Sequence, residues 1–273
     1  MIDLFESPKR SILRAHHHIA DLAAHVRAFE IEKAWSYVVD DDTDSFHKLH
    51  KIRFARRLPD DLPSILFDAV NNLRAALDQC AYASAIAAKG TSLKHVKFPF
   101  ANDQAHWLNA VRGSCKDLPP EIRSLFERCN AYKGGNDALW ALNEICNTKK
   151  HFALVPLSIG SAKLTLELED PTGPTLSRTG KGVRVAGFYG TVGGRISPTS
   201  RLWDARKNEL LLLRTDPKPK IHYHADVAVS VAIEGIDILR SKPAVGVLEE
   251  MLKITAKIGA ETEAECRRLG FIG

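Results

Sequence analysis

The stretch that decides the fold is residues 58–90, LPDDLPSILFDAVNNLRAALDQCAYASAIAAKG. Asp60 and Ser64 suit the first turn of a helix, alanine-rich composition favours its interior, and Gly90 suits its end. Apolar residues recur on one side at helical spacing. These are Leu66, Val70, Leu73 and Leu77. The sequence therefore predicts a long amphipathic helix that packs one face into a core.

The opposite side of this helix is polar. Asn71, Arg74 and Asp78 are spaced at i, i+3 and i+7, so they fall within about 60° of one another around the axis. Short, directional side chains of this kind have poor helix propensity unless they find partners. The pattern indicates a polar site or a polar network on this face.

A second helix, expected from about residue 136 to residue 148, repeats the arrangement. Asn143, Asn147 and Lys150 share one side at i, i+4 and i+7, with His151 close by. If the two helices face each other, their polar sides form one hydrogen-bonded cluster. Two interpretations stay open at this point: a network that only fixes helix pairing, and a ligand-binding or catalytic site in which Arg74 meets a phosphate or carboxylate.

The two segments DAVNNLRAALDQCAY (68–82) and LWALNEICNTKKHF (139–152) resemble an uncharacterised family of bacterial and phage proteins. In that family a helix of the form N-L-R-x-A-L-D-H is followed by L-x-x-L-N-x-x-x-x-K-H. The resemblance covers about residues 63–152. The first segment is also similar to the R-x4-H signature of HEPN-type helical RNases (the higher-eukaryote and prokaryote nucleotide-binding domain).

This resemblance implies RNA as a partner, a site at a homodimer interface, and roles for individual residues. Arg74 would stabilise the negative charge of the phosphate, and Asp78 would orient Arg74. The histidine position of the signature is Gln79 here, and glutamine cannot exchange a proton near neutral pH. His151 would then supply the acid–base group. Because of this departure, the sequence leaves open whether the protein is an enzyme.

The rest of the chain predicts an α+β fold with a helical N-terminal half and an antiparallel, β-rich C-terminal half. Further helices are expected over about 11–35, 103–111 and 120–129, and two short strands around an acidic turn over 37–54. Strand patterns follow over 151–159, 162–170, 182–190, 208–215 and 220–235, and a helix closes the chain over 243–269. The switch near His151 predicts regions 1–150 and 151–273, either as two domains or within one integrated domain.

The composition is that of a globular protein of 273 residues, with 45% hydrophobic and 26% charged residues. No apolar run approaches the roughly 20 residues that span a bilayer, and the N-terminal segment lacks the pattern of a signal peptide. The five cysteines include no C-x-x-C pair, which favours a reducing compartment. We therefore expect a cytoplasmic protein without membrane partners. No nucleotide-loop or dinucleotide fingerprint is present, so no cofactor is predicted.

One dense basic segment, HKLHKIRFARR (47–57), interrupts an otherwise mixed charge pattern. Lysines and arginines on an edge strand discourage edge-to-edge pairing, and the same residues could contact phosphate. Lys51 and Arg53 are the candidate ligand residues of this segment, for RNA or a small phosphorylated ligand.

Histidines alternate with other residues in KIHYHAD, so His222, His224 and Asp226 share one face of a strand. A transition metal could use that geometry, but the opposite face is apolar, and the polar face of a half-buried strand explains the same pattern. Spacing nominates no further ligand, and no metal site is predicted.

Overall fold

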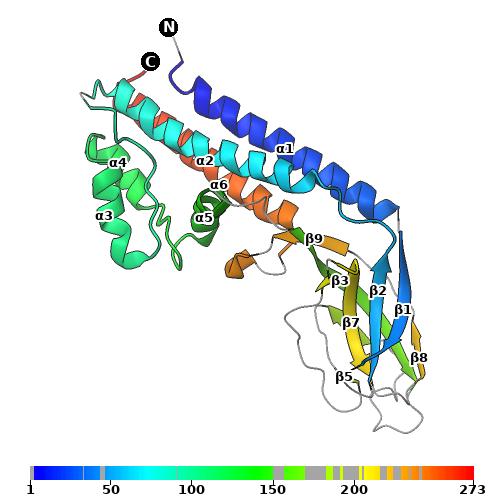
Figure 1. Ribbon diagram of the computed structural model, residues 1–273. Helices are drawn as coiled ribbons and strands as arrows, with labels where there is room; N and C mark the ends of the chain where they lie inside the picture. Colours follow the sequence, from blue (N-terminus) through cyan, green and yellow to red (C-terminus); the bar gives the residue numbers. More distant parts are fainter. Residues whose placement is uncertain are drawn as a thin grey trace.

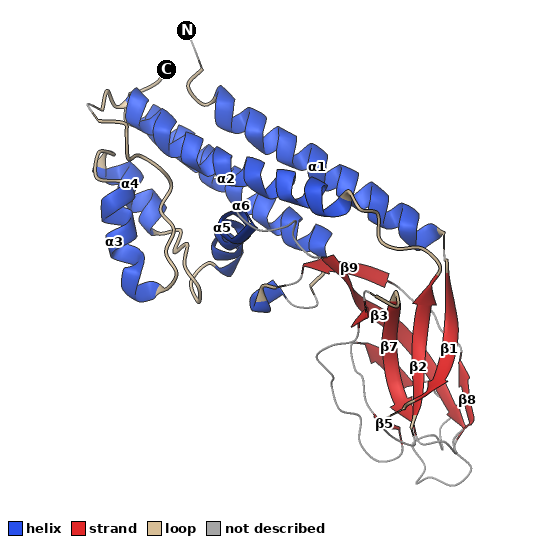
Figure 2. Cartoon of the chain, viewed as in Figure 1, coloured by secondary structure: helices blue, strands red, loops and turns tan. Residues whose placement is uncertain are grey.

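The computed structural model describes residues 3–32, 34–43, 47–90, 92–149, 157–169, 183–186, 191–192, 203–204, 206–215, 220–223, 229–233, 235–239 and 242–273. For residues 148–149, and for most strand residues from 157 to 230, only the backbone is described. Long helices and a strand-rich region occupy opposite ends of the molecule (Figures 1 and 2). This α+β class agrees with the sequence.

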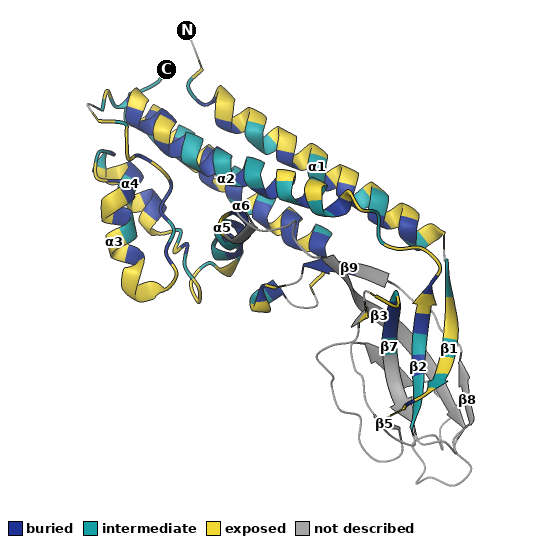
Figure 3. Ribbon diagram, in the orientation of Figure 1, coloured by how far each residue is buried: buried dark blue, intermediate teal, exposed yellow. Residues whose placement is uncertain are grey.

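Three long helices lie side by side: α1 (Glu6–Ile31), α2 (Leu62–Ala87) and α6 (Ala244–Arg268). α1 packs along α2, and α6 packs against both. Figure 3 shows that each turns its buried side toward the others. The apolar stripe predicted for α2 is this contact, because Leu66, Val70, Leu73 and Leu77 are completely buried. The closing helix therefore completes the core begun by the first half of the chain.

The end of α2 differs in detail from the expectation. Lys89, not Gly90, takes the left-handed conformation, with φ of 55°. Gly90 donates from its backbone N to the Ala85 carbonyl at 2.9 Å. A Cβ at Gly90 would lie 3.1 Å from that oxygen, so glycine is needed for close approach and not for positive φ.

Shorter helices cover one side of the long ones. They are α3 (Gln104–Ser114), α4 (Pro120–Glu127) and α5 (Asp137–Lys149). α5 packs against α2 and α6, and α4 packs against α6. Residues 94–100, which connect α2 to α3, form neither helix nor strand. The predicted ranges of these helices agree with the structure to within a few residues.

The strands form two described sheets. The first holds β1 (Trp35–Asp41), β2 (Lys48–Phe54), β7 (Glu209–Thr215), β5 (Thr191–Val192) and β6 (Trp203–Asp204), in which β2 lies between β1 and β7. The second holds β4 (Val183–Ala186), β3 (Leu157–Glu169), β8 (Lys220–Tyr223) and β9 (Val229–Ile233). A 3₁₀ turn, η1 (Asp237–Leu239), precedes α6.

The predicted β1–β2 hairpin is confirmed, since the two strands pair antiparallel from Trp35–Phe54 to Asp41–Lys48. Three details of the strand region differ from the sequence pattern. The strands expected over 151–159 and 162–170 are one strand across the described residues 157–169, β3, with a register irregularity between Ile159 and Ser161. The single strand expected over 220–235 is two strands, which pair with different parts of β3. The β5–β7 pair is parallel, not antiparallel.

The antiparallel, β-rich character of the whole C-terminal half stays a prediction, because much of that half lies outside the described residues. The boundary at residue 150 also stays a prediction. Within the described ranges, none of the helices has both the length and the apolar character needed to cross a bilayer.

Candidate anion-binding pocket

Arg74 connects two helices. Its Nη1 donates to the Asp78 carboxylate one turn further along α2, and its Nε donates to Asn143 Oδ1 on α5 at 3.2 Å. The Arg74 side chain is only 18% exposed, whereas that of Asp78 is 38% exposed. The predicted pairing of the α2 and α5 polar faces is therefore present for these three residues.

The segment between α2 and α3 also contacts Arg74 and Asp78. The backbone N of Phe98 donates to Asp78 Oδ1 at 3.0 Å. The Phe100 ring lies against the guanidinium, with 4.2 Å between Arg74 Cζ and the ring centroid. A cation over an aromatic face at this distance is attracted by the ring quadrupole. Arg74 is thus fixed in position by Asp78, Asn143 and Phe100.

These contacts form one wall of a cavity of about 650 Å³, here called the Arg74 pocket. Its polar and charged lining comes from α2, residues 94–102, α3 and α5, and comprises Arg74, Lys94, His95, Lys97, Asn102, Ser114, Asn143 and Asn147. No aspartate or glutamate lines it among the described residues. Lys94 and Lys97 are exposed to solvent. A cleft lined by one sign of charge concentrates counter-ions of the other sign.

The sequence did not single out Lys94 and Lys97. The sequence feature that could have identified them is the run KHVKFPF (94–100). Its proline prevents a helix, and its two phenylalanines can anchor a segment that is otherwise cationic beside α2. Asn147 also lines the pocket, is exposed and lies on the last turn of α5, and its role in ligand binding stays a prediction.

Asn71 lies at the α2–α5 contact but does not line the pocket. Its Oδ1 accepts a hydrogen bond from Cys146 Sγ at 3.5 Å. Gln79, which stands where the resembled RNases have histidine, faces α1, and its Oε1 accepts from Ser11 Oγ at 2.9 Å. Five residues advance about 140° around a helix, so Gln79 cannot share the face of Arg74.

Lys51 and Arg53 lie on β2, away from the Arg74 pocket. β2 pairs with β1 and with β7, so the interpretation of this basic segment as an edge strand is wrong. Lys51 Nζ is 3.0 Å from Asp40 and 3.2 Å from Glu209, and Arg53 Nη2 is 2.6 Å from the other Glu209 oxygen. Burial lowers the pKa of Lys51, but its hydrogen bonds to the two carboxylates outweigh this, and the pKa is raised. Because carboxylates already neutralise both cations, we do not assign them to the site.

Lys150 and His151 lie outside the described residues, so the pairing of His151 with Arg74 stays a prediction. His224 and Asp226 also lie outside them, and only the backbone of His222 is described. Across the described ranges, no group of three histidine, cysteine or carboxylate side chains is arranged to hold a metal ion.

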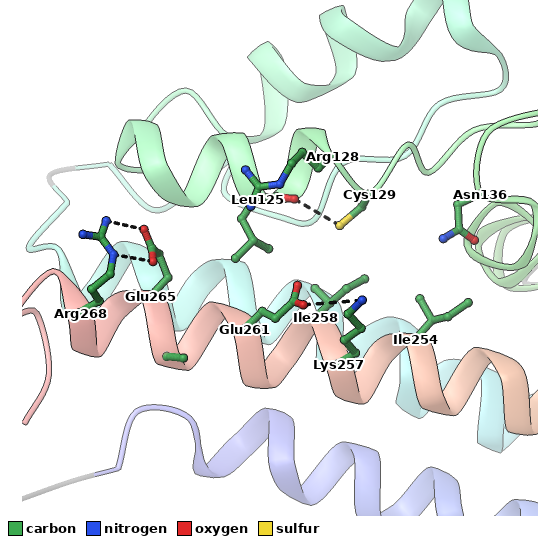
Figure 4. A pocket seen from close by; sticks show the side chains of 11 residues that line it. Leu125, Arg128, Cys129, Asn136, Ile254, Lys257, Ile258, Glu261, Glu265 and Arg268 are labelled. Atoms are coloured by element: carbon green, nitrogen blue, oxygen red, sulfur yellow. Dashed lines mark hydrogen bonds and ion pairs between the residues drawn. The ribbon is translucent and has the colours of Figure 1, made fainter.

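A second cavity, of about 640 Å³, lies between α4 and α6 (Figure 4). Four of its five charged side chains pair with each other: Arg268 donates to both Glu265 oxygens at 2.7 and 2.8 Å, and Lys257 is 3.8 Å from Glu261. Burial raises the pKa of the Cys129 thiol to about 12, so it carries little thiolate. Mixed, mutually paired charges make this cavity less suited to an anion than the Arg74 pocket.

Comparison of the chain with protein-family models, with curated proteins and with solved structures gives no match, so the assignment of the site rests on its geometry.

Proposed function

We propose that this protein binds a phosphorylated ligand in the Arg74 pocket, either RNA or a small phosphorylated molecule. The observation that supports this most directly is the lining of the pocket, with three cationic side chains and no carboxylate among its described residues. Guanidinium and ammonium groups form charge-assisted hydrogen bonds with phosphate oxygens, about twice as strong as neutral ones. The resemblance of α2 to the HEPN signature points to the same class of ligand.

Binding should be measured by fluorescence anisotropy with a labelled RNA 12-mer and by calorimetry with a nucleoside monophosphate. The double variant Lys94→Ala/Lys97→Ala should weaken binding by about tenfold or more, since each lost phosphate contact costs roughly 1 kcal/mol. Both lysines are exposed, so the melting temperature should stay unchanged. Lys253→Ala/Lys257→Ala, which removes two exposed lysines of α6, is the matched control and should bind as the wild type does.

Absence of saturable binding to either probe would contradict the proposal. So would equal loss of affinity in the α6 control, because binding would then reflect overall charge and not the pocket.

The catalytic form of the proposal is metal-independent RNA cleavage in the cytoplasm, within a homodimer. Arg74 would stabilise the charge that develops on the phosphate, Asp78 would orient Arg74, and His151 would act as general base. Cleavage of single-stranded RNA by the wild type should be lost in both Arg74→Ala and His151→Ala. Cleavage that survives both substitutions would rule out these roles.

A second function is favoured by a specific observation: Arg74 is mostly buried and links α2, α5 and residue 100. In this alternative, the contacts of Arg74 with Asp78, Asn143 and Phe100 only fix the packing of these segments. Arg74→Ala would then lower the free energy of unfolding by a few kcal/mol, while the lysine double variant would bind RNA and nucleotide no differently from the wild type. The two variants together therefore separate a binding pocket from a structural network.

A further inference from the structure

We infer that the Arg74 pocket selects a phosphomonoester, the terminal phosphate of a nucleotide-sized group, over the internal phosphodiester of a nucleic-acid chain. This inference rests on the binding form of the proposed function and specifies its ligand. It excludes the catalytic form, in which Arg74 would act on an internal phosphodiester.

The depth of Arg74 is the first argument. Its side chain is 18% exposed, two of its N–H groups bond Asp78 and Asn143, and Phe100 covers one face of the guanidinium. Only a group that projects into the pocket can reach the remaining N–H donors. An internal phosphodiester has a nucleoside on each side, whereas a terminal phosphate enters with its oxygens first.

Charge is the second argument. Arg74, Lys94 and Lys97 line the cavity, and Asp78 pairs with Arg74 from outside the lining, which leaves two positive charges around the cavity. A phosphomonoester carries about −1.5 to −2 charges at pH 7 and presents three acceptor oxygens. A phosphodiester carries a single negative charge, so it leaves part of this positive charge unmatched.

Space is the third argument. α3 faces the pocket with Ala110, Gly113 and Ser114. A Cβ added to Gly113 would meet no atom within 4 Å, so no packing contact requires a glycine there. Glycine within a helix costs about 1 kcal/mol relative to alanine, and here it leaves room beside Lys97. The volume of about 650 Å³ lies within the range of small-molecule sites.

The test compares three labelled RNA 12-mers of one sequence, with a 5′-phosphate, with a 3′-phosphate, and with hydroxyl groups at both ends. At least one phosphorylated oligomer should bind ten times or more tighter than the hydroxyl form. Lys94→Ala/Lys97→Ala should remove this preference. An unlabelled nucleoside monophosphate should displace the phosphorylated oligomer if the free nucleotide is the ligand, and should fail to do so if the RNA chain itself contributes to binding.

Equal binding of all three oligomers, still sensitive to the lysine variant, would overturn this inference and leave the proposed function intact. Absence of binding by all probes would overturn both.

A steric variant gives an independent test. Gly113→Phe fills the space beside α3 and should weaken binding of the phosphorylated oligomer at least tenfold, whereas Gly113→Ala should bind as the wild type does. Neither variant should lower the melting temperature, because the site is exposed and uncrowded, and Gly113→Ala should raise it slightly, because alanine favours the helix. Full affinity in Gly113→Phe would show that the ligand does not occupy this pocket.

Discussion

His50 is a buried imidazole on β2, the strand that lies between β1 and β7. Burial lowers its pKa from the ordinary value near 6.5 to about 4. In the unfolded chain His50 takes up a proton near pH 6.5, but in the folded protein it stays neutral until about pH 4. Its contribution to stability is therefore fully present above pH 6.5 and is lost as the pH falls from there toward 4.

Between pH 7 and pH 5 this linkage should cost the folded protein about 2 kcal/mol, at 1.36 kcal/mol per unit of pKa. The His50→Gln variant cannot titrate and should lose correspondingly less stability over the same interval. Urea unfolding of both proteins at the two pH values measures the difference. An identical loss in both would show that His50 does not carry this pH dependence.

At the level of residues, part of the site could be predicted. The spacing of Arg74 and Asp78 placed them on one face of α2, and Asn143 was expected opposite them because short, directional polar side chains on both helices favour a shared hydrogen-bonded network. Lys94, Lys97 and Phe100 could not be assigned, since they belong to a segment without helical or strand periodicity. Its position depends on the Asp78–Phe98 hydrogen bond, which no local pattern predicts.

At the level of elements, α6 fits against its neighbours at Gly259. A Cβ at this position would lie 3.4 Å from Cys80 Sγ on α2 and 3.6 Å from Ile12 Cδ1 on α1. A methyl group thus meets ordinary contacts, and any larger side chain meets two helices. By contrast, a Cβ at Gly246, on the same helix, meets no atom within 4 Å.

Gly259→Ala should raise the free energy of unfolding by about 0.5–1 kcal/mol, because alanine favours the helix. Gly259→Leu should lower it by about 1–3 kcal/mol, the usual cost of overpacking. Gly246→Leu is the matched control and should not destabilise the protein. Chemical denaturation measures all three. A stable Gly259→Leu variant would indicate that α6 packs less closely on α1 and α2.

The bounds of the later helices were predicted to within a few residues because proline and apolar spacing are local signals. The first helix was misplaced: it was expected over 11–35 but is Glu6–Ile31, and Trp35 begins β1. The pairing of strands was less predictable. The pattern over 220–235 is continuous in sequence, but β8 and β9 pair with separate parts of β3. Parallel pairing of β5 with β7 likewise depends on distant contacts.

At the scale of the whole molecule, the helical first half and the last helix share one core. Val247, Leu248 and Met251 of α6 are buried, and α6 packs on α1, α2 and α5. The hairpin strand β2 also pairs with β7 from the second half. A fragment of residues 1–150 would expose the apolar faces that these partners cover.

We expect this fragment to unfold without a cooperative transition and to bind a hydrophobic dye, in contrast to the full chain. Near-ultraviolet circular dichroism during urea denaturation is the appropriate measurement. A sharp transition in the fragment, with a midpoint close to that of the full chain, would instead support an independent domain ending near residue 150.

The contacts of Arg74 have a consequence for sequence divergence. Its partners come from positions 78, 100 and 143, so a change at one of them alters what the others can tolerate. In diverged homologues, the residues at these three positions should therefore change together. Lys94 and Lys97 have no such structural partners among the described residues and should vary independently of them, following only the demands of the ligand.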